Sequence, residues 1–220
     1  DTGRVLSRYV DVIVLRTFEQ ERLEVLAGAA DVPVINSLSD FEHPCQALAD
    51  LLTIREHRGS LAGTVLTYVG DGNNVAHSLL LAGAKAAMTV RVATPAGFAP
   101  IPQVVERATE IARETGGAVE VGTDPAAAAT GSHVLYTDVW ASMGQEAERV
   151  QRLEAFGAGL VGLDAGDAVR RQRARAHQKF RIPFGVDVVG DDGDVVALAH
   201  VLAEQVHQRG LARSDRTADA

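Results

Sequence analysis

The sequence has few of the features that mark secreted, membrane or nucleic-acid-binding proteins. It contains one cysteine, Cys45, which rules out an internal disulfide and fits a reducing, cytoplasmic compartment. No apolar run approaches the ~18 residues needed to span a bilayer, and no basic-then-apolar leader opens the chain. Acidic residues (29) outnumber basic ones (21), and the net charge of −8 argues against nucleic acid and anionic membranes as partners. We therefore expect a cytoplasmic globular protein whose partners are small molecules or proteins.

What the sequence does contain is a regular alternation of two patterns. With 220 residues, 46% of them hydrophobic, it can form one large domain or two smaller ones. Short β-branched runs alternate with helical patterns, so crossover connections should make the strands mainly parallel. This predicts an α/β protein with doubly wound, mostly parallel sheets and a boundary between two units in residues 56–63. The expected strands are 12–16 (a buried strand), 32–37, 63–70, 89–95, 118–122 and 133–140, and the expected helices are 19–30, 44–57, 74–88, 101–117 and 124–131.

The first polar cluster is HPCQALADLLTIREH, residues 43–57. Pro44 suits the first helical position, which puts His43 at the N-cap and Gln46 in the first turn. Both side chains then lie at the positive end of the helix dipole, an environment suited to an anion or a polarised carbonyl. The alternative is that His43 only caps the helix. The residues expected to anchor the helix through an apolar face are Leu48, Leu51 and Leu52.

The second cluster is YVGDGNNVAHSLL, residues 68–80, a turn from a strand into a helix. It has Gly70-x-Gly72 but lacks the third glycine of a dinucleotide fingerprint, so it is a weak nicotinamide signal. Asn73 and Asn74 place amides where parallel strands end, which is the usual ligand-binding edge of such sheets. An ordinary Gly/Asn turn explains the pattern equally well.

The third cluster is TDVWASMGQE, residues 137–146, at the end of the last regular strand. The carboxylate of Asp138 and the hydroxyl of Ser142 could hold a cationic amine while nearby backbone groups hold a carboxylate. An amino acid carries both groups. The alternative is an ordinary loop in which Asp138 or Ser142 caps the next helix.

These three strings, in this order and spacing, closely resemble the ornithine carbamoyltransferases of the aspartate/ornithine carbamoyltransferase family. The resemblance runs from DTGRVLSRYV at the start of the chain to about Phe156. It implies two α/β domains, one for carbamoyl phosphate and one for L-ornithine, and a reaction that yields L-citrulline and phosphate. It also implies a homotrimer or a multiple of trimers, with active sites near subunit interfaces, and neither a metal nor an organic cofactor.

The resemblance also implies roles for individual residues. Arg16 and His43 would donate hydrogen bonds to the oxyanion that develops on the carbamoyl group, and Gln46 would accept from its NH₂. Asp138 would pair with the α-ammonium of ornithine. Cys45 is not the cysteine that the family uses for ornithine, and we expect it to be a packed thiol. The full set is Arg16, His43 and Gln46 for carbamoyl phosphate, and Asn74, Asp138, Ser142 and Met143 for ornithine.

The sequence also departs from the family pattern. The family's Ser-x-Arg-Thr phosphate-binding loop lies upstream of the residues present here, and its His-Cys-Leu-Pro loop and late arginine do not appear after Phe156. We therefore expect a partial carbamoyl-phosphate-binding domain (1–57), an ornithine-binding domain (58–165) and a divergent tail (166–220). Activity should be impaired, and a non-catalytic fragment, or an ornithine-binding or assembly module, is the alternative.

The divergent tail has its own patterns, a strand over 184–190 and an amphipathic helix over 194–210. Residues 170–181 contain six basic side chains, which we interpret as a solvated helical face because the flanking residues are acidic. Our hypothesis is that residues after about 156 are a frame-shifted translation. Translating the other reading frames of the coding DNA tests it, since finding no His-Cys-Leu-Pro in any frame would exclude it.

Overall fold

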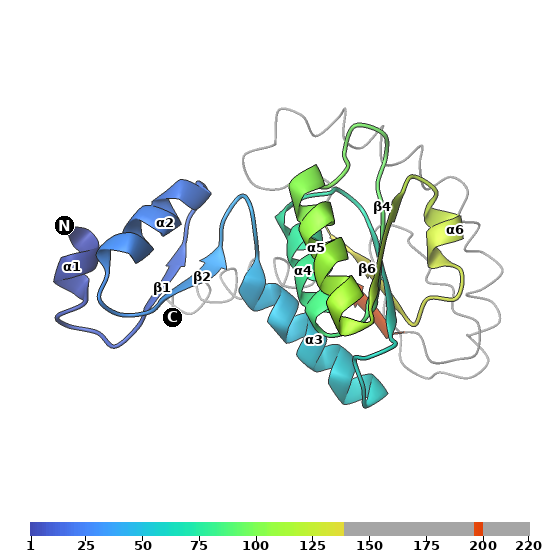
Figure 1. Cartoon of the computed structure of the whole chain (residues 1–220), viewed down its shortest axis with the longest axis horizontal. Helices are drawn as coiled ribbons and strands as arrows, with labels where there is room; N and C mark the ends of the chain where they lie inside the picture. The colour runs from blue at the N-terminus through green and yellow to red at the C-terminus, as the bar shows by residue number, and fades with distance from the viewer. Residues whose placement is uncertain (139–195, 200–220) are drawn as a thin grey trace, which may run out of the picture.

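The computed structural model describes residues 1–138 and 196–199, which form two parallel sheets with helices packed on them (Figure 1). One sheet has two strands, and the other has five in the order β5-β4-β3-β6-β7. Every strand pair within the described residues is parallel. The predicted α/β class with parallel sheets is therefore confirmed. No helix in the described part of the chain is both long and apolar enough to cross a membrane.

The first unit consists of residues 1–38. Its elements are α1 (Thr2–Leu6), β1 (Ile13–Arg16), α2 (Gln20–Ala29) and β2 (Val34–Leu38). The prediction of a strand at 12–16 is correct, but the prediction that it is buried is wrong for one face: Ile13 is buried, whereas Val14 is 59% exposed. Successive strand side chains point to opposite faces, and only one face is covered, by α2, against which α1 packs.

Helix α3 (Pro44–Arg58) leads from the first sheet to the second. Its buried side chains are Ala47, Asp50 and Ile54, three and four residues apart, so they share one face. The predicted anchor of three leucines is wrong for two of them, because Leu48 and Leu52 lie on the opposite, exposed side. The helix ends at Gly59, whose left-handed conformation (φ 78°) suits a residue without a Cβ.

The second unit begins after α3 and contains the larger sheet. Its elements are β3 (Val65–Val69), α4 (Asn74–Lys85), β4 (Thr89–Ala93), α5 (Pro102–Thr115), β5 (Ala118–Gly122), α6 (Pro125–Ala129), β6 (Val134–Thr137) and β7 (Val196–Ala199). Helices α3, α4 and α5 lie on one side of this sheet and α6 on the other (Figure 1). The crossovers predicted from the alternating pattern therefore cover both faces.

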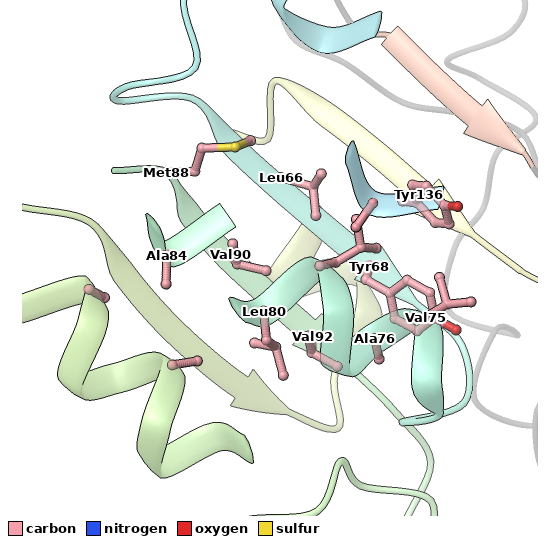
Figure 2. Close-up of a cluster of buried hydrophobic side chains, with 14 of the residues drawn as sticks. Leu66, Tyr68, Val75, Ala76, Leu80, Ala84, Met88, Val90, Val92 and Tyr136 are labelled. Atoms are coloured by element: carbon pink, nitrogen blue, oxygen red, sulfur yellow. The ribbon is translucent and has the colours of Figure 1, made fainter. Parts of the chain in front are cut away.

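The core lies between this sheet and helix α4 (Figure 2). Leu66 and Tyr68 of β3 point towards α4 and are fully buried. Thr67, between them, points to the opposite face, where its hydroxyl donates to the Ala128 carbonyl of α6 (3.0 Å). Helix and sheet approach closely at Gly83, because a Cβ there would overlap the Val90 side chain. The alternation of the strand thus sorts its residues between the two helical layers.

The tail corrects one prediction. Residues 196–199 form strand β7, parallel to β6 and in register with it, instead of part of the helix predicted over 194–210. A short Val-Ala-Leu-Ala run fits either a buried strand or one side of a helix, and periodicity alone does not separate them. Pairing satisfies backbone groups along one edge of β6, which favours the strand. The strand predicted over 184–190 lies outside the described residues.

Candidate functional site

The first part of the candidate site is the amino-terminal end of α3. His43 is its N-cap and Pro44 its first residue, as predicted. The imidazole makes no capping hydrogen bond to the helix, so the alternative in which His43 serves only as a cap is not supported. Its backbone N–H instead donates to Ser78 Oγ on α4 (2.7 Å). The histidine is therefore held from the second unit while its side chain is not used for capping.

A hydrogen-bonded path leads from α3 to the end of β6. Gln46 Nε2 donates to Asp50 Oδ1 (2.9 Å), and Asp50 is also bonded to the side chain of Tyr136. Burial raises the pKa of Tyr136, and the charges of Asp50 and Asp138 add to the rise. The phenol therefore stays protonated and donates to the Asp50 carboxylate. This fixes the first turns of α3 against the carboxyl end of β6.

Asp138 follows β6 directly, at the carboxyl edge of the parallel strands, and is 8% exposed. Burial, and then the charges of Asp138 and Asp71, raise the pKa of Tyr68 on the neighbouring strand. The two tyrosine rings pack 5.8 Å apart. A nearly buried carboxylate beside neutral phenols is an environment that favours a cationic partner such as an amine.

In the second cluster, Asn73 and Asn74 make different kinds of hydrogen bond. Asn73 is the N-cap of α4, and its Oδ1 accepts from the backbone N–H groups of Val75 (3.0 Å) and Ala76 (3.3 Å). Asn74 Nδ2 donates to the Ser39 carbonyl (2.7 Å) in the segment that leads to His43. The ordinary-turn alternative therefore explains Asn73, whereas Asn74 joins α4 to the segment between the two units.

The glycine pair has a packing explanation. The N–H of Gly72 donates to the Phe98 carbonyl (2.8 Å), and a Cβ on Gly72 would overlap the backbone of residues 98–100. The missing side chain lets one loop of the chain lie against another. In a dinucleotide fingerprint the glycine lets a pyrophosphate lie close to the backbone, whereas here residues 98–100 lie against Gly72.

Arg16 is the last residue of β1 and lies opposite Leu38 in the parallel register. The next segment, which begins at Ser39, carries His43, so Arg16 and this segment share one end of the small sheet. Arg16 is exposed, and among the described residues its guanidinium has no hydrogen-bond or ion-pair partner. The described contacts do not join it to the other predicted ligands. Ser142 and Met143 lie outside the described residues.

The structure adds residues that the sequence reasoning missed. Asp50 lies four residues after Gln46, and His77 and Ser78 lie three and four after Asn74, spacings that put each set on one helix face. That spacing was the feature of the sequence from which these residues could have been predicted.

The prediction of Cys45 as a packed thiol is wrong. Cys45 is exposed, because the first turn of α3 directs it away from the core, and its Sγ lies 3.5 Å from the Asn36 carbonyl. Within the described residues no three His, Cys, Asp or Glu side chains gather to hold a metal ion.

Fold and site together define an α/β protein with two parallel sheets and polar side chains at the carboxyl ends of its strands, where such proteins bind small ligands. Two known protein families match parts of this chain. "Aspartate/ornithine carbamoyltransferase, carbamoyl-P binding domain" matches residues 1–56, and "Aspartate/ornithine carbamoyltransferase, Asp/Orn binding domain" matches residues 62–162. The chain belongs to the aspartate/ornithine carbamoyltransferase family.

Individual relatives agree. The chain is 58% identical over 191 residues to the ornithine carbamoyltransferase of Acidothermus cellulolyticus, a match that covers 84% of this chain and 61% of that protein. The ornithine carbamoyltransferase structure from Pyrococcus furiosus has a TM-score of 0.68 at 55% identity, covering 71% of this chain and 50% of that one. The Gloeobacter violaceus structure has a TM-score of 0.65 at 57% identity, with 71% and 52% covered. The chain thus spans about half to three-fifths of the length of these relatives.

Proposed function

We propose that this chain is part of an ornithine carbamoyltransferase, which transfers the carbamoyl group of carbamoyl phosphate to the δ-amine of L-ornithine and releases L-citrulline and phosphate. The observation that carries the proposal is the path from Gln46 through Asp50 to Tyr136, two residues before Asp138. It ties the helix end expected to hold the carbamoyl group to the strand end expected to hold the amine acceptor. The names of the relatives support the same reaction.

We further propose a division into a carbamoyl-phosphate-binding domain (1–57), an ornithine-binding domain (58–165) and a divergent tail (166–220). Matches of separate family descriptions to residues 1–56 and 62–162 support it. The family resemblance supports a homotrimer, or a multiple of trimers, that works in arginine metabolism without a cofactor. The single exposed thiol, Cys45, supports a reducing cytoplasmic setting.

In the proposed reaction the neutral δ-amine attacks the carbamoyl carbon. A C–N bond forms, the C–O bond to phosphate breaks, and the nitrogen loses a proton. Arg16 and His43 would donate to the carbonyl oxygen as negative charge develops there, and each such donor typically contributes ~2.7–4 kcal/mol to lowering the barrier. The NH₂ of Gln46 faces Asp50, which supports a role for its carbonyl as acceptor from the carbamoyl NH₂. The residues proposed for ornithine are Asn74, Asp138, Ser142 and Met143.

We also propose that residues 1–220 by themselves turn over slowly. Within residues 1–220 no Ser-x-Arg-Thr motif lies before β1, where it would hold the leaving phosphate, and no His-Cys-Leu-Pro motif occurs. The second candidate is a non-catalytic ornithine-binding or assembly module. Both candidates bind ornithine at the edge that carries Asp138, and only the first forms citrulline.

The deciding experiment follows citrulline formed from radiolabelled carbamoyl phosphate by the purified 220-residue chain, with ornithine binding measured by calorimetry. The Acidothermus cellulolyticus relative is the reference for full turnover. We expect a rate far below the reference and measurable ornithine binding. Asp138→Asn, which removes the charge and keeps the shape, should abolish both signals, whereas Asp31→Asn, at an exposed carboxylate, should change neither.

The outcomes separate the candidates. Ornithine binding without citrulline selects the non-catalytic module. Turnover equal to that of the relative contradicts the proposed impairment. Ornithine binding that survives Asp138→Asn contradicts the proposed ornithine site.

A further inference from the structure

The first two turns of α4 form hydrogen bonds with every second residue of the segment 39–43, which carries His43. One helix face supplies all three side chains, because they lie at i, i+3 and i+4. Their backbone partners lie two residues apart along the segment. The pairs are Asn74 Nδ2 with the Ser39 carbonyl (2.7 Å), His77 Nδ1 with the Phe41 carbonyl (2.8 Å), and Ser78 Oγ with the His43 N–H (2.7 Å).

His77 uses both of its ring nitrogens in this contact. The N–H of Ile101 donates to Nε2 (3.2 Å), so Nε2 carries no proton, and Nδ1–H donates to the Phe41 carbonyl. His77 is 3% exposed, and the centroid of its ring lies 5.6 Å from that of the Phe41 ring. Burial lowers the pKa of His77, against the opposing effects of the Phe41 carbonyl and the charge of Asp71. The neutral imidazole thus clamps two loops onto α4.

These bonds cross from one family domain to the other. Ser39, Phe41 and His43 lie in the segment matched by the carbamoyl-P domain, and α4 lies in the segment matched by the Asp/Orn domain. In the proposed reaction each domain holds one substrate, so the distance from the amine to the carbamoyl carbon depends on how the two domains are held. A misplacement of about 1 Å can lower such a rate a hundredfold.

We propose that His77 and Ser78 are positioning residues, which fix His43 against the ornithine-binding unit through the backbone of residues 39–43. Neither is among the residues expected to contact a substrate. Ser78 acts on the backbone of His43 itself, and His77 acts two residues earlier. The catalytic meaning of this placement rests on the proposed function, whereas the placement itself does not.

The placement is tested by amide hydrogen exchange measured by NMR on the whole chain. Ser78→Ala removes the acceptor of the His43 N–H, and we expect that amide to exchange at least about tenfold faster, the effect of losing one hydrogen bond. Thr109→Ala is the matched control, because among the described residues its hydroxyl bonds only to the Val105 carbonyl within α5. It should leave the His43 amide unchanged. An unchanged His43 amide in Ser78→Ala would overturn the proposal, whatever the activity.

Two substitutions of His77 separate its two bonds. His77→Asn keeps a donor near Nδ1 and loses the acceptor at Nε2, so the Ile101 amide should exchange faster while His43 stays protected. His77→Ala loses both, and the Ile101 and His43 amides should both exchange faster. Equal protection of His43 in the unsubstituted chain and in His77→Ala would exclude His77 from this role.

Kinetics test what the placement does. His77→Ala should lower kcat for citrulline formation about tenfold and leave KM for ornithine within about twofold, the pattern of an interaction that matters in the transition state. His77→Asn should recover most of that loss. A rise in KM at constant kcat would overturn the positioning role. If the unsubstituted chain binds no ornithine and forms no citrulline, the proposed function fails, and the exchange data still decide whether His77 and Ser78 place His43.

Discussion

The two units of the chain use the same βαβ pattern and differ in how much of it they bury. Among the described residues, most of the exposed large hydrophobic side chains lie in residues 1–38, including Tyr9 (79% exposed) and Phe18 (63%). Every described side chain with less than 2% exposure lies at Ser39 or later. The second unit has helices on both faces of its sheet, whereas the first covers one face of two strands. Parallel strands ordinarily need cover on both faces.

The difference assigns separate tasks to the two units. The core that stabilises the chain is in the second unit, which also carries Asp138. The first unit presents Arg16 from a two-stranded sheet that buries little, and the segment that follows this sheet, residues 39–43, bonds to α4. The candidate site therefore joins a well-packed element to a weakly packed one, and matched substitutions in the two units should have very different effects.

The largest difference should appear when a buried and an exposed apolar side chain are truncated. Leu80 on α4 is fully buried, and Leu80→Ala should lower the free energy of unfolding by ~2–5 kcal/mol. Val14, 59% exposed on β1, is the control, and Val14→Ala should change it by less than about 0.5 kcal/mol. Urea unfolding followed by circular dichroism measures both. A comparable loss at Val14 would show that this face is covered in solution and would remove the contrast between the units.

Adding one methyl group should change stability in opposite directions in the two units. Gly72→Ala forces a Cβ into the backbone of residues 98–100 and should destabilise the protein by about 1–3 kcal/mol. Gly28, the next-to-last residue of helix α2, has open space where a Cβ would lie, with no atom within 4 Å apart from its chain neighbours and its own helix backbone. Gly28→Ala should therefore stabilise the protein by roughly 0.5–1 kcal/mol. Thermal unfolding of the two variants gives the signs. The same sign in both would contradict the packing difference.

Helix capping offers a smaller contrast. Asn73 caps α4 through two hydrogen bonds, and Asn73→Ala should lower the free energy of unfolding by about 1 kcal/mol. Glu19 is the N-cap of α2 and makes no such bond, while its ion pair with Arg22 is largely exposed. Glu19→Ala should therefore change stability by less than about 0.5 kcal/mol. Urea midpoints compare the two variants, and equal losses would mean that Asn73 contributes little as a cap.

The sequence predicted the alternation of strands and helices because period-2 and period-3.6 patterns are local. It did not predict α1, a single five-residue turn of helix too short to show a period. It also could not show that one face of β1 stays open, since Val14 and Ile13 are equally apolar and only the packing distinguishes them. Strand β7 was not predicted either, because its four apolar residues also fit the longer helical pattern over 194–210.

The same division applies to the site. Motif strings indicated His43, Gln46 and Asp138, because helix starts and strand ends can be located from local patterns. Ser78 is 35 residues from its partner His43 in sequence, and spacing carries no information about such a contact. The bond between Asp50 and Tyr136 was equally invisible, since it forms only once α3 lies over the end of β6.

The smallest expected effect is a histidine-linked pH dependence that the first unit should not share, since residues 1–38 contain no histidine. Burial lowers the pKa of His77, against the opposing charge of Asp71, so below about pH 6.5 the unfolded chain binds a proton that the folded chain resists. The contribution of neutral His77 to the free energy of unfolding should therefore be fully present above about pH 6.5. It should fall as the pH drops from there towards the pKa of His77 in the folded state. One proton limits the slope to about 1.4 kcal/mol per pH unit.

Urea unfolding between pH 5.5 and 7.5 measures this slope in three proteins. His77→Asn should reduce it but not remove it, because the pKa of His133 is also lowered by burial, and its Nδ1 accepts from the Val65 N–H (2.9 Å). Thr109→Ala, which removes a hydroxyl on α5 and no titratable group, should leave the slope as it is in the unsubstituted chain. An identical slope in the His77 variant would mean that His77 can accept a proton without loss of the fold. The contact of α4 with residues 39–43 would then not depend on the neutral form of His77.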